Sequence, residues 1–211
     1  MDSTGLSPKM TAVYQAVIEL FTEGADLNNL TVAEITAKAG IGKGTAYEYF
    51  SNKEEMIAGA LFHEMKNACQ SLCRRFEQEK DLCAKVDFIL MDMEEHFANT
   101  NCFFRALHVL MDHSAISAKL REMVRTKRED EILIMDMIRM LIDKEMEDVK
   151  GLTGEDKEYL MMMVLSKIIC FALYQFGAKH ELHLESGAMR ALICRNISRE
   201  VESFRTGMIG V

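Results

Sequence analysis

Apolar residues recur every three to four positions along most of this chain, the spacing of one face of an α-helix. The first stripe includes Val13 and Phe21 and follows Ser7-Pro8, a pair that suits the cap and first position of a helix, so a helix is expected over 8–23. Later stripes predict further helices over about 53–79, 82–97, 115–150, 160–176 and 185–204. The pattern therefore predicts an all-α protein.

The segment 31–56 predicts two short helices joined by a turn. Thr31 stands three residues before Glu34, which is the spacing of a capping box that starts a helix. Gly40 follows that helix and suits the left-handed geometry that ends it. A second short helix is expected over 43–50.

The first turn of the second helix is slim, because it carries Gly44, Thr45 and Ala46. A slim, polar turn can enter the major groove of DNA, and phosphates favour the positive amino end of a helix. Ser51 and Glu54 have the spacing of another capping box, which starts a long helix at Lys53 and places its ammonium near a passing phosphate. These features together predict a helix-turn-helix.

At these residues the chain resembles the TetR family of transcriptional repressors, whose DNA-binding signature is matched by residues 41–55, IGKGTAYEYFSNKEE. The resemblance implies a three-helix DNA-binding head at 1–52 and a helical effector-binding and dimerisation body at 53–211, with about nine helices in all. It also implies that Phe50 packs inside the head. The residues that it places at the DNA are Thr31, Lys43, Gly44, Thr45, Tyr47, Glu48, Tyr49 and Lys53.

Two positions depart from the signature of that family. Gly42 stands where a capping serine is usual, and Glu48 occupies an exposed site that is often aromatic or basic. Glu48 either accepts a hydrogen bond from a cytosine amino group or is repelled outward by the phosphates.

Charge argues against a head that binds nucleic acid indiscriminately. The chain has a formal net charge of −8, and residues 1–53 hold four lysines against six acidic residues. With Lys38, Lys43 and Lys53 as the lysines near DNA, we expect weak nonspecific binding with a shallow salt dependence. The acidic balance also keeps an alternative open, a helical sensor or protein-interaction module without operator binding.

Thr153 and Asp156 can cap the start of the penultimate helix. That helix is apolar all round over 160–176, so it is expected to be buried on two sides. One face could pack on the body and the other on a second copy, with the final helix beside it. This predicts a homodimer through the last two helices. A dimer would present two recognition helices about 34–36 Å apart to a pseudo-palindromic double-stranded DNA operator.

The body is rich in methionine and phenylalanine, which adapt their shape to apolar molecules. We therefore expect a small, apolar effector of unknown identity, which by family resemblance would shift the two heads and release DNA. For each candidate residue by itself, ordinary core packing is the alternative. The candidates are Phe62, Met65, Cys69, Phe88, Phe103, Phe104, Leu107, His108, Met111 and Tyr174.

Other functional classes find little support in the sequence. There is no phosphate loop, nucleophile elbow or His-Glu-x-x-His motif, so we expect neither an enzyme nor a cofactor. Cys69 and Cys73 share a helical face, but without a matching ligand pair we expect no metal site. The N-terminus lacks a secretory pattern and Ser166-Lys167 interrupts the longest apolar run, which predicts a cytoplasmic protein without a membrane span.

Overall fold

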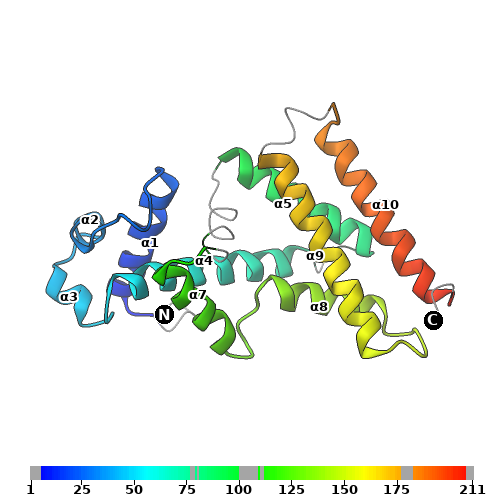
Figure 1. Ribbon diagram of the computed structural model, residues 1–211, viewed down its shortest axis with the longest axis horizontal. Helices are drawn as coiled ribbons and strands as arrows, with labels where there is room; N and C mark the ends of the chain where they lie inside the picture. The colour runs from blue at the N-terminus through cyan, green and yellow to red at the C-terminus, as the bar shows by residue number, and fades with distance from the viewer. Residues whose placement is uncertain are drawn as a thin grey trace. The chain divides into compact units, whose positions relative to one another are not determined.

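The computed structural model describes residues 6–76, 79, 81–99, 109, 112–176 and 183–207, and all regular structure within them is helical (Figure 1). The all-α class predicted from the apolar spacing is therefore confirmed. The helices in these ranges are α1 (Pro8–Thr22), α2 (Val32–Lys38), α3 (Lys43–Tyr47), α4 (Lys53–Phe76), α5 (Leu82–Asn99), α7 (Ala115–Thr126), α8 (Ile134–Glu145), α9 (Gly154–Phe176) and α10 (Ser186–Arg205).

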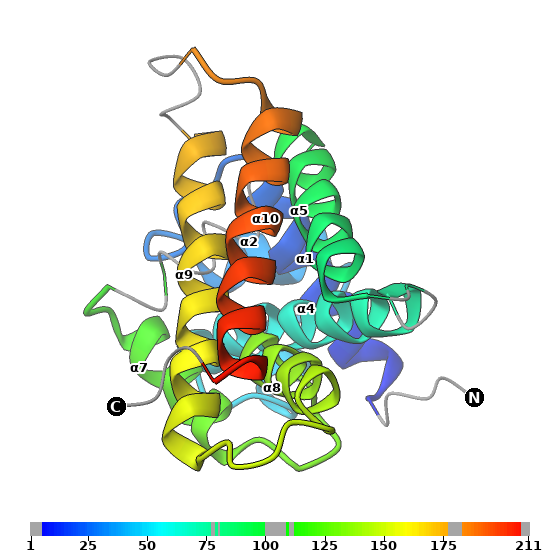
Figure 2. The same ribbon diagram turned by 90° about the vertical axis from the view of Figure 1, so that its right-hand side faces the viewer.

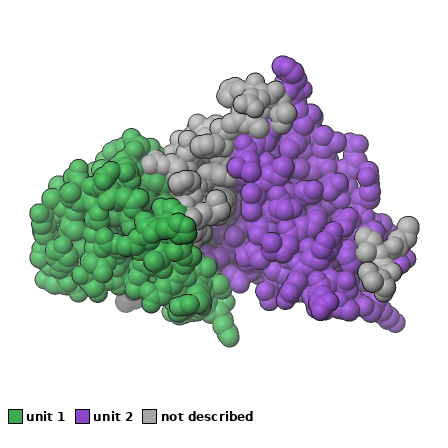
Figure 3. All heavy atoms as spheres, in the orientation of Figure 1, with its two compact units in different colours: residues 1–68, 100–131 green, residues 69–99, 132–211 purple. Residues whose placement is uncertain are grey.

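The chain divides into two compact units (Figure 3). Unit 1 consists of residues 1–68 and 100–131, and unit 2 of residues 69–99 and 132–211. Helix α4 contributes residues to both units. The sequence predicted a different division, by function, into a DNA-binding head at 1–52 and a body at 53–211. The two compact units do not test that division, so it stays a prediction.

The first three helices of unit 1 pack on one another around a small apolar core. Helix α1 begins as predicted, because the Ser7 hydroxyl accepts a hydrogen bond from the Met10 amide at 3.2 Å. Val13 and Ile35 are fully buried at the centre of this core. The side chain of Phe50 is 3% exposed, so its predicted place inside the head is confirmed.

The start of α4 differs from the predicted Ser51/Glu54 capping box by one residue. Asn52 Oδ1 accepts from the Glu55 amide at 2.8 Å, and Glu55 Oε2 accepts from the Ser51 amide at 2.7 Å. The prediction was wrong because asparagine caps a helix as well as serine and stands immediately before Lys53, where α4 begins.

The single helix predicted over 115–150 is two helices, α7 and α8. Helix α7 ends where Lys127 takes an extended conformation, with φ −56° and ψ 151°. The Arg128 amide then donates to the Glu131 carboxylate at 2.9 Å instead of continuing the helix. The prediction failed because residues 127–131 are all charged and offer no apolar side chain to pack.

Unit 2 is built from α5, α8, α9 and α10, which pack around a core containing Ile89, Val164 and Phe171. Figure 2 shows α9 and α10 side by side with α5 next to α10. Helix α9 begins with the predicted cap, since the Thr153 hydroxyl accepts from the Asp156 amide at 3.1 Å.

A partly buried ion pair holds the segment after α7 against α4 within unit 1. Lys66 Nζ lies 3.1 Å from Glu131 Oε1, and the two side chains are 15% and 14% exposed. Burial raises the pKa of the Glu131 carboxyl, but the Arg128 amide and the Lys66 ammonium outweigh burial and hold this pKa below its ordinary value of 4.5.

Glu131→Gln is expected to lower the free energy of unfolding by about 1–3 kcal/mol at pH 7, since it leaves Lys66 partly buried without its partner charge. A carboxyl whose folded pKa is lowered stabilises fully above its ordinary pKa, and this contribution disappears as pH falls through the lowered value. Urea unfolding from pH 7 to pH 3 measures the difference between wild type and variant.

The matched control for this ion pair is Glu129→Gln, an exposed glutamate two residues away. Its effect should be small at every pH. If Glu131→Gln is equally mild at pH 7, or if its effect does not shrink in acid, the ion pair does not stabilise unit 1.

Candidate nucleic-acid interface

Helices α2 and α3 form the predicted helix-turn-helix. The Thr31 hydroxyl accepts from the Glu34 amide at 3.2 Å while the Glu34 carboxylate accepts from the Thr31 amide at 2.8 Å, which confirms the capping box. Gly40 ends the first helix with φ 68°, a left-handed conformation that favours glycine. The Ile41 amide then bonds back to the Thr36 carbonyl at 3.0 Å and closes the turn.

Helix α3 is shorter than predicted, with five residues in place of the expected 43–50. Its cap, Gly42, makes no side-chain hydrogen bond, so the helix lacks the bond that a serine would supply. Ala46 is the fully buried residue of α3, and the Phe50 amide donates to its carbonyl at 3.1 Å. One side of this short helix is thus fixed against the head core.

The opposite side of the helix-turn-helix faces solvent. Tyr47 is 52% exposed and Tyr49 is 36% exposed, which is unusual for large aromatic side chains. Among the predicted DNA contacts, Thr45 and Lys53 are half-buried. The exposed members are Thr31, Lys43, Gly44, Tyr47, Glu48 and Tyr49. Exposure makes these six available to a ligand, but DNA contact itself stays a prediction.

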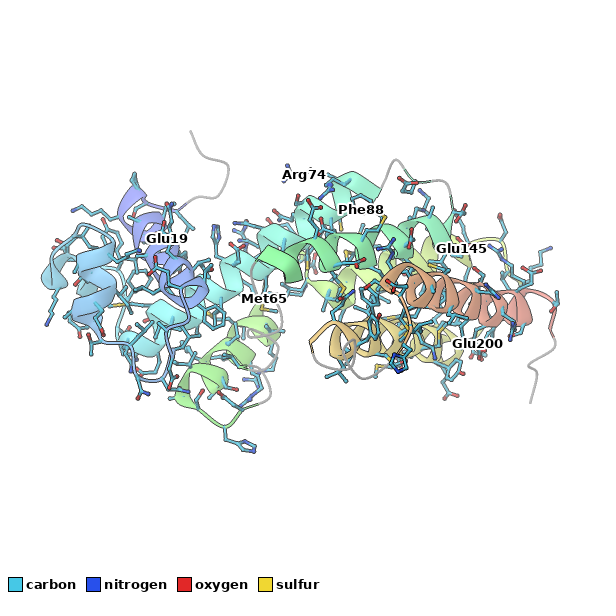
Figure 4. All side chains as sticks on the ribbon, turned by 90° about the horizontal axis from the view of Figure 1, so that it is seen from above. Glu19, Met65, Arg74, Phe88, Glu145 and Glu200 are labelled. Atoms are coloured by element: carbon cyan, nitrogen blue, oxygen red, sulfur yellow. The ribbon has the colours of Figure 1, made fainter. Side chains whose placement is uncertain are left out.

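The lysines of the head differ in their freedom to meet phosphates. Lys38 Nζ lies 2.6 Å from Glu23 Oε1 and 3.5 Å from Glu19 Oε2 (Glu19 is labelled in Figure 4). The hydrogen bond to Glu23 raises the Lys38 pKa, so its charge is already compensated. Lys53 Nζ donates to the Asn28 carbonyl at 2.8 Å, which fixes its position beside the start of α4.

Lys43 is exposed at the first position of α3, and its ammonium makes no ion pair within the described ranges. It is the lysine best placed to neutralise a phosphate near the amino end of this helix. The salt dependence of DNA binding is therefore expected to rest on Lys43 and Lys53 rather than on three lysines.

Tyr14 of α1 links the recognition segment to α4 within unit 1, a role that the sequence did not indicate. Its ring centroid lies 5.6 Å from that of Phe50 and 5.6 Å from that of His63. A Cβ atom at Gly59 would lie 2.6 Å from the Tyr14 hydroxyl, so glycine allows this close approach. Burial and then the Glu55 carboxylate raise the Tyr14 pKa.

The described candidates for effector binding are spread along three helices. Met65 and Cys69 on α4 and Tyr174 on α9 are buried, and Phe62 on α4 is half-buried. Phe88 on α5 is labelled in Figure 4. The Arg75 guanidinium carbon lies 4.5 Å from the centroid of its ring. Phe103, Phe104, Leu107, His108 and Met111 lie outside the described residues.

Two observations favour packing for the buried candidates. The Tyr174 hydroxyl donates to the Leu184 carbonyl, and this bond ties the end of α9 to the segment before α10. Burial raises the pKa of the Cys69 thiol to about 12, which makes it a poor thiolate for ligand chemistry. The effector site therefore stays a prediction.

A hollow of about 500 Å³ lies at the ends of α8 and α10 in unit 2. None of the predicted effector residues that the structure describes lines it. Arg205 crosses it to the Glu145 carboxylate, which Figure 4 labels. Its lining is formed by Glu145, Asp148, Val149, Lys150 and Arg205. Such a charged, open lining is unlike the apolar pocket expected for the effector. In the ranges given above, no cluster of three or more metal-ligating side chains occurs.

One family of known proteins matches the chain over this interface. Residues 15–60 match the family described as bacterial regulatory proteins, tetR family. An uncharacterized HTH-type transcriptional regulator of Bacillus subtilis, YvdT, is 27% identical over 84 residues, which are 40% of this chain. That match spans 43% of the curated relative.

Solved structures share the fold over nearly the whole chain. The transcriptional regulator FadR of Bacillus subtilis, solved with stearoyl-CoA, has a TM-score of 0.61 and 14% identity, covering 93% of this chain and 98% of FadR. A tetR-family transcriptional regulator of Streptomyces coelicolor has a TM-score of 0.63 and 14% identity, covering 96% and 84%. The matched proteins are regulators rather than enzymes, as the sequence predicted.

Proposed function

We propose that this chain, a member of the TetR family of bacterial regulatory proteins, regulates transcription by binding an operator as a homodimer through residues 1–52. The observation that carries this proposal is the exposed Tyr47 on a short helix whose other side is fixed by buried Ala46. The exposed Tyr47 ring and the Lys43 ammonium lie on one short helix, where a base edge and a phosphate could be contacted together.

Dimerisation is needed because each head offers one short recognition helix and few positive charges. A pseudo-palindrome contacted twice multiplies the effect of each weak half-site. An exposed apolar stripe on α9 supports a dimer seam, since its residues recur at helical spacing on the side away from the core. The stripe consists of Tyr159 (52% exposed), Met162 (56%), Ile169 (40%) and Leu173 (61%).

Helix α10 adds to the same proposed seam. The Tyr159 hydroxyl donates to Glu200 Oε1 at 2.8 Å, which ties the stripe to α10 (Glu200 is labelled in Figure 4). Leu192 on α10 is itself 47% exposed. A second copy packing here would cover both helices, as the sequence predicted for the last two helices.

We further propose that a small, apolar effector binds residues 53–211 and releases the operator, which would make the protein a repressor. The apolar side chains of Met65 and Phe62 on α4 support this choice, since an effector pressed against α4 could act on the helix that continues from the head. FadR, which shares the fold, was solved with an acyl-CoA.

Operator DNA lies in the bacterial cytoplasm, so the proposed activity requires the protein to be there. Within the described ranges α9 alone is long and apolar enough to cross a membrane, with a mean hydropathy of 1.3, and a core helix of a soluble protein passes the same test. Pairing α9 with a second copy would account for its exposed apolar side without a bilayer.

A second function remains for the head, binding a protein partner in place of an operator. Its support is the acidic balance of residues 1–53, strengthened by the pairing of Lys38 with Glu23. A head with two available lysines has little electrostatic attraction for phosphates, so DNA binding must come from shape and base contacts.

Selection of bound duplexes from a random-sequence pool, at two salt concentrations, tests the proposed function. Enrichment of an inverted repeat, with footprints about one helical turn apart, is the expected result. Enrichment of a single half-site would overturn the dimer but keep DNA binding. No enrichment at low salt would favour the protein-partner function.

A further inference from the structure

Two cysteines on different helices of unit 2 lie in contact. Cys83 belongs to α5 and Cys194 to α10, and the Cys194 sulfur lies 3.5 Å from the Cys83 carbonyl oxygen. Cys83 is half-exposed whereas Cys194 is 3% exposed, so a small reagent meets Cys83 first.

The register of the two helices is fixed beside this pair. Arg190, four residues before Cys194, forms an ion pair with Asp87, four residues after Cys83, with Nε 3.1 Å from Oδ1. The same guanidinium also binds the Glu94 carboxylate. Figure 2 shows α5 and α10 packed side by side. These ion pairs hold Cys83 and Cys194 in register on the two helices while both residues are reduced.

The other buried pair of thiols is not comparable. Cys69 and Cys73 lie four residues apart on α4, where Cβ atoms stand about 5–6 Å from each other. A disulfide needs Cβ atoms about 3.5–4.5 Å apart, so a helix must deform to form one. Cys83 and Cys194 lie on two different helices, so a disulfide between them does not require one helix to deform.

We propose that Cys83 and Cys194 form a reversible disulfide when a peroxide oxidises the protein. The peroxide converts the Cys83 thiol to a sulfenic acid and leaves as one water. The Cys194 sulfur then attacks the Cys83 sulfur, its proton and the hydroxyl leave as a second water, and the S–S bond forms. Two electrons pass to the peroxide, and a low-molecular-weight thiol reverses the reaction by exchange. In a reducing compartment such a bond is transient and signals oxidation.

Burial sets the speed of this reaction. Burial, followed by the hydrogen bond to Cys83, raises the pKa of the Cys194 thiol to about 12. The attacking species is the thiolate, so closure of the disulfide is expected to be slow at pH 7 and roughly tenfold faster for each pH unit up to pH 9. The product is uncharged and suits the buried site better than a thiolate does.

The test treats the full chain with hydrogen peroxide, blocks remaining thiols with iodoacetamide and maps the peptides by mass. The expected product joins the peptides of Cys83 and Cys194, has lost two hydrogens, and is released by dithiothreitol. A cross-link spanning 111 positions should also raise the melting temperature by several degrees in the oxidised sample.

Cys194→Ser keeps a hydroxyl in the place of the thiol and should leave the Cys83 sulfenic acid trappable by dimedone. Cys73→Ser is the matched control, a buried cysteine that should leave the cross-link intact. A bond from Cys83 to any other cysteine, or oxidation of Cys83 to sulfinic acid without a cross-link, would overturn the proposal. None of these readouts requires DNA binding.

Discussion

Tyr47→Ala is expected to lower affinity for the selected operator about 10- to 100-fold while the chain stays folded. Tyr47 is 52% exposed, so its removal costs the head little stability, whereas a base-edge or phosphate contact is worth about 1–3 kcal/mol. Both heads of the proposed dimer lose the contact, and two contacts at about 1 kcal/mol each, the lower end of this range, give a loss of about 30-fold. Fluorescence anisotropy with a labelled operator measures the affinity, and circular dichroism checks the fold.

Variants of Lys43 separate charge from shape at the same surface. Lys43→Ala should weaken binding to all sequences alike and reduce the slope of log affinity against log salt by about one for each head. Lys144→Ala, at an exposed lysine of α8, is the matched control and should change neither quantity. If Tyr47→Ala and Lys43→Ala both bind like wild type, the residues inferred from family resemblance do not contact DNA.

Features set by neighbours in the sequence were predicted well. The caps at Thr31 and Thr153 depend on a carboxylate three residues later, and the left-handed turn depends on Gly40. Each of these signals is complete within five residues, so no knowledge of the fold is needed to use it.

Features set by packing were not predictable in the same way. The break between α7 and α8 carries neither glycine nor proline, and only the charged run 127–131 marks it in the sequence. The ion pair of Lys38 with Glu23 joins α2 to the end of α1, and the contact of Tyr14 with Gly59 joins α1 to α4. These contacts depend on which helix faces meet, which one sequence does not specify.

The candidate site shows the same division. Resemblance to a known family named the residues of the helix-turn-helix, and the structure places six of the eight on its exposed side. The effector residues were chosen for size and type alone. Phe88 and Tyr174 already have intramolecular partners, Arg75 and the Leu184 carbonyl, so bulk and position on a helix do not separate pocket from core.

Leu173→Glu is expected to convert the proposed dimer to a monomer and to reduce operator affinity more than any change in the head. Leu173 is 61% exposed on α9, so the charge costs the isolated chain almost nothing. In a symmetric seam the change occurs twice, removes two buried leucines at about 1.5–3 kcal/mol each, and buries two like charges. The equilibrium constant for dimer formation should fall by roughly 1,000-fold or more.

Met91→Glu provides the matched control, because Met91 is 48% exposed on α5 and lies outside the proposed seam. Size-exclusion chromatography with light scattering at micromolar concentration should find a dimer for wild type and Met91→Glu and a monomer for Leu173→Glu. A monomer retains one recognition helix and loses the gain from two joined half-sites, so operator binding should fall with it. A dimer in all three proteins places the seam elsewhere, and a dimer broken by Met91→Glu alone moves it to α5.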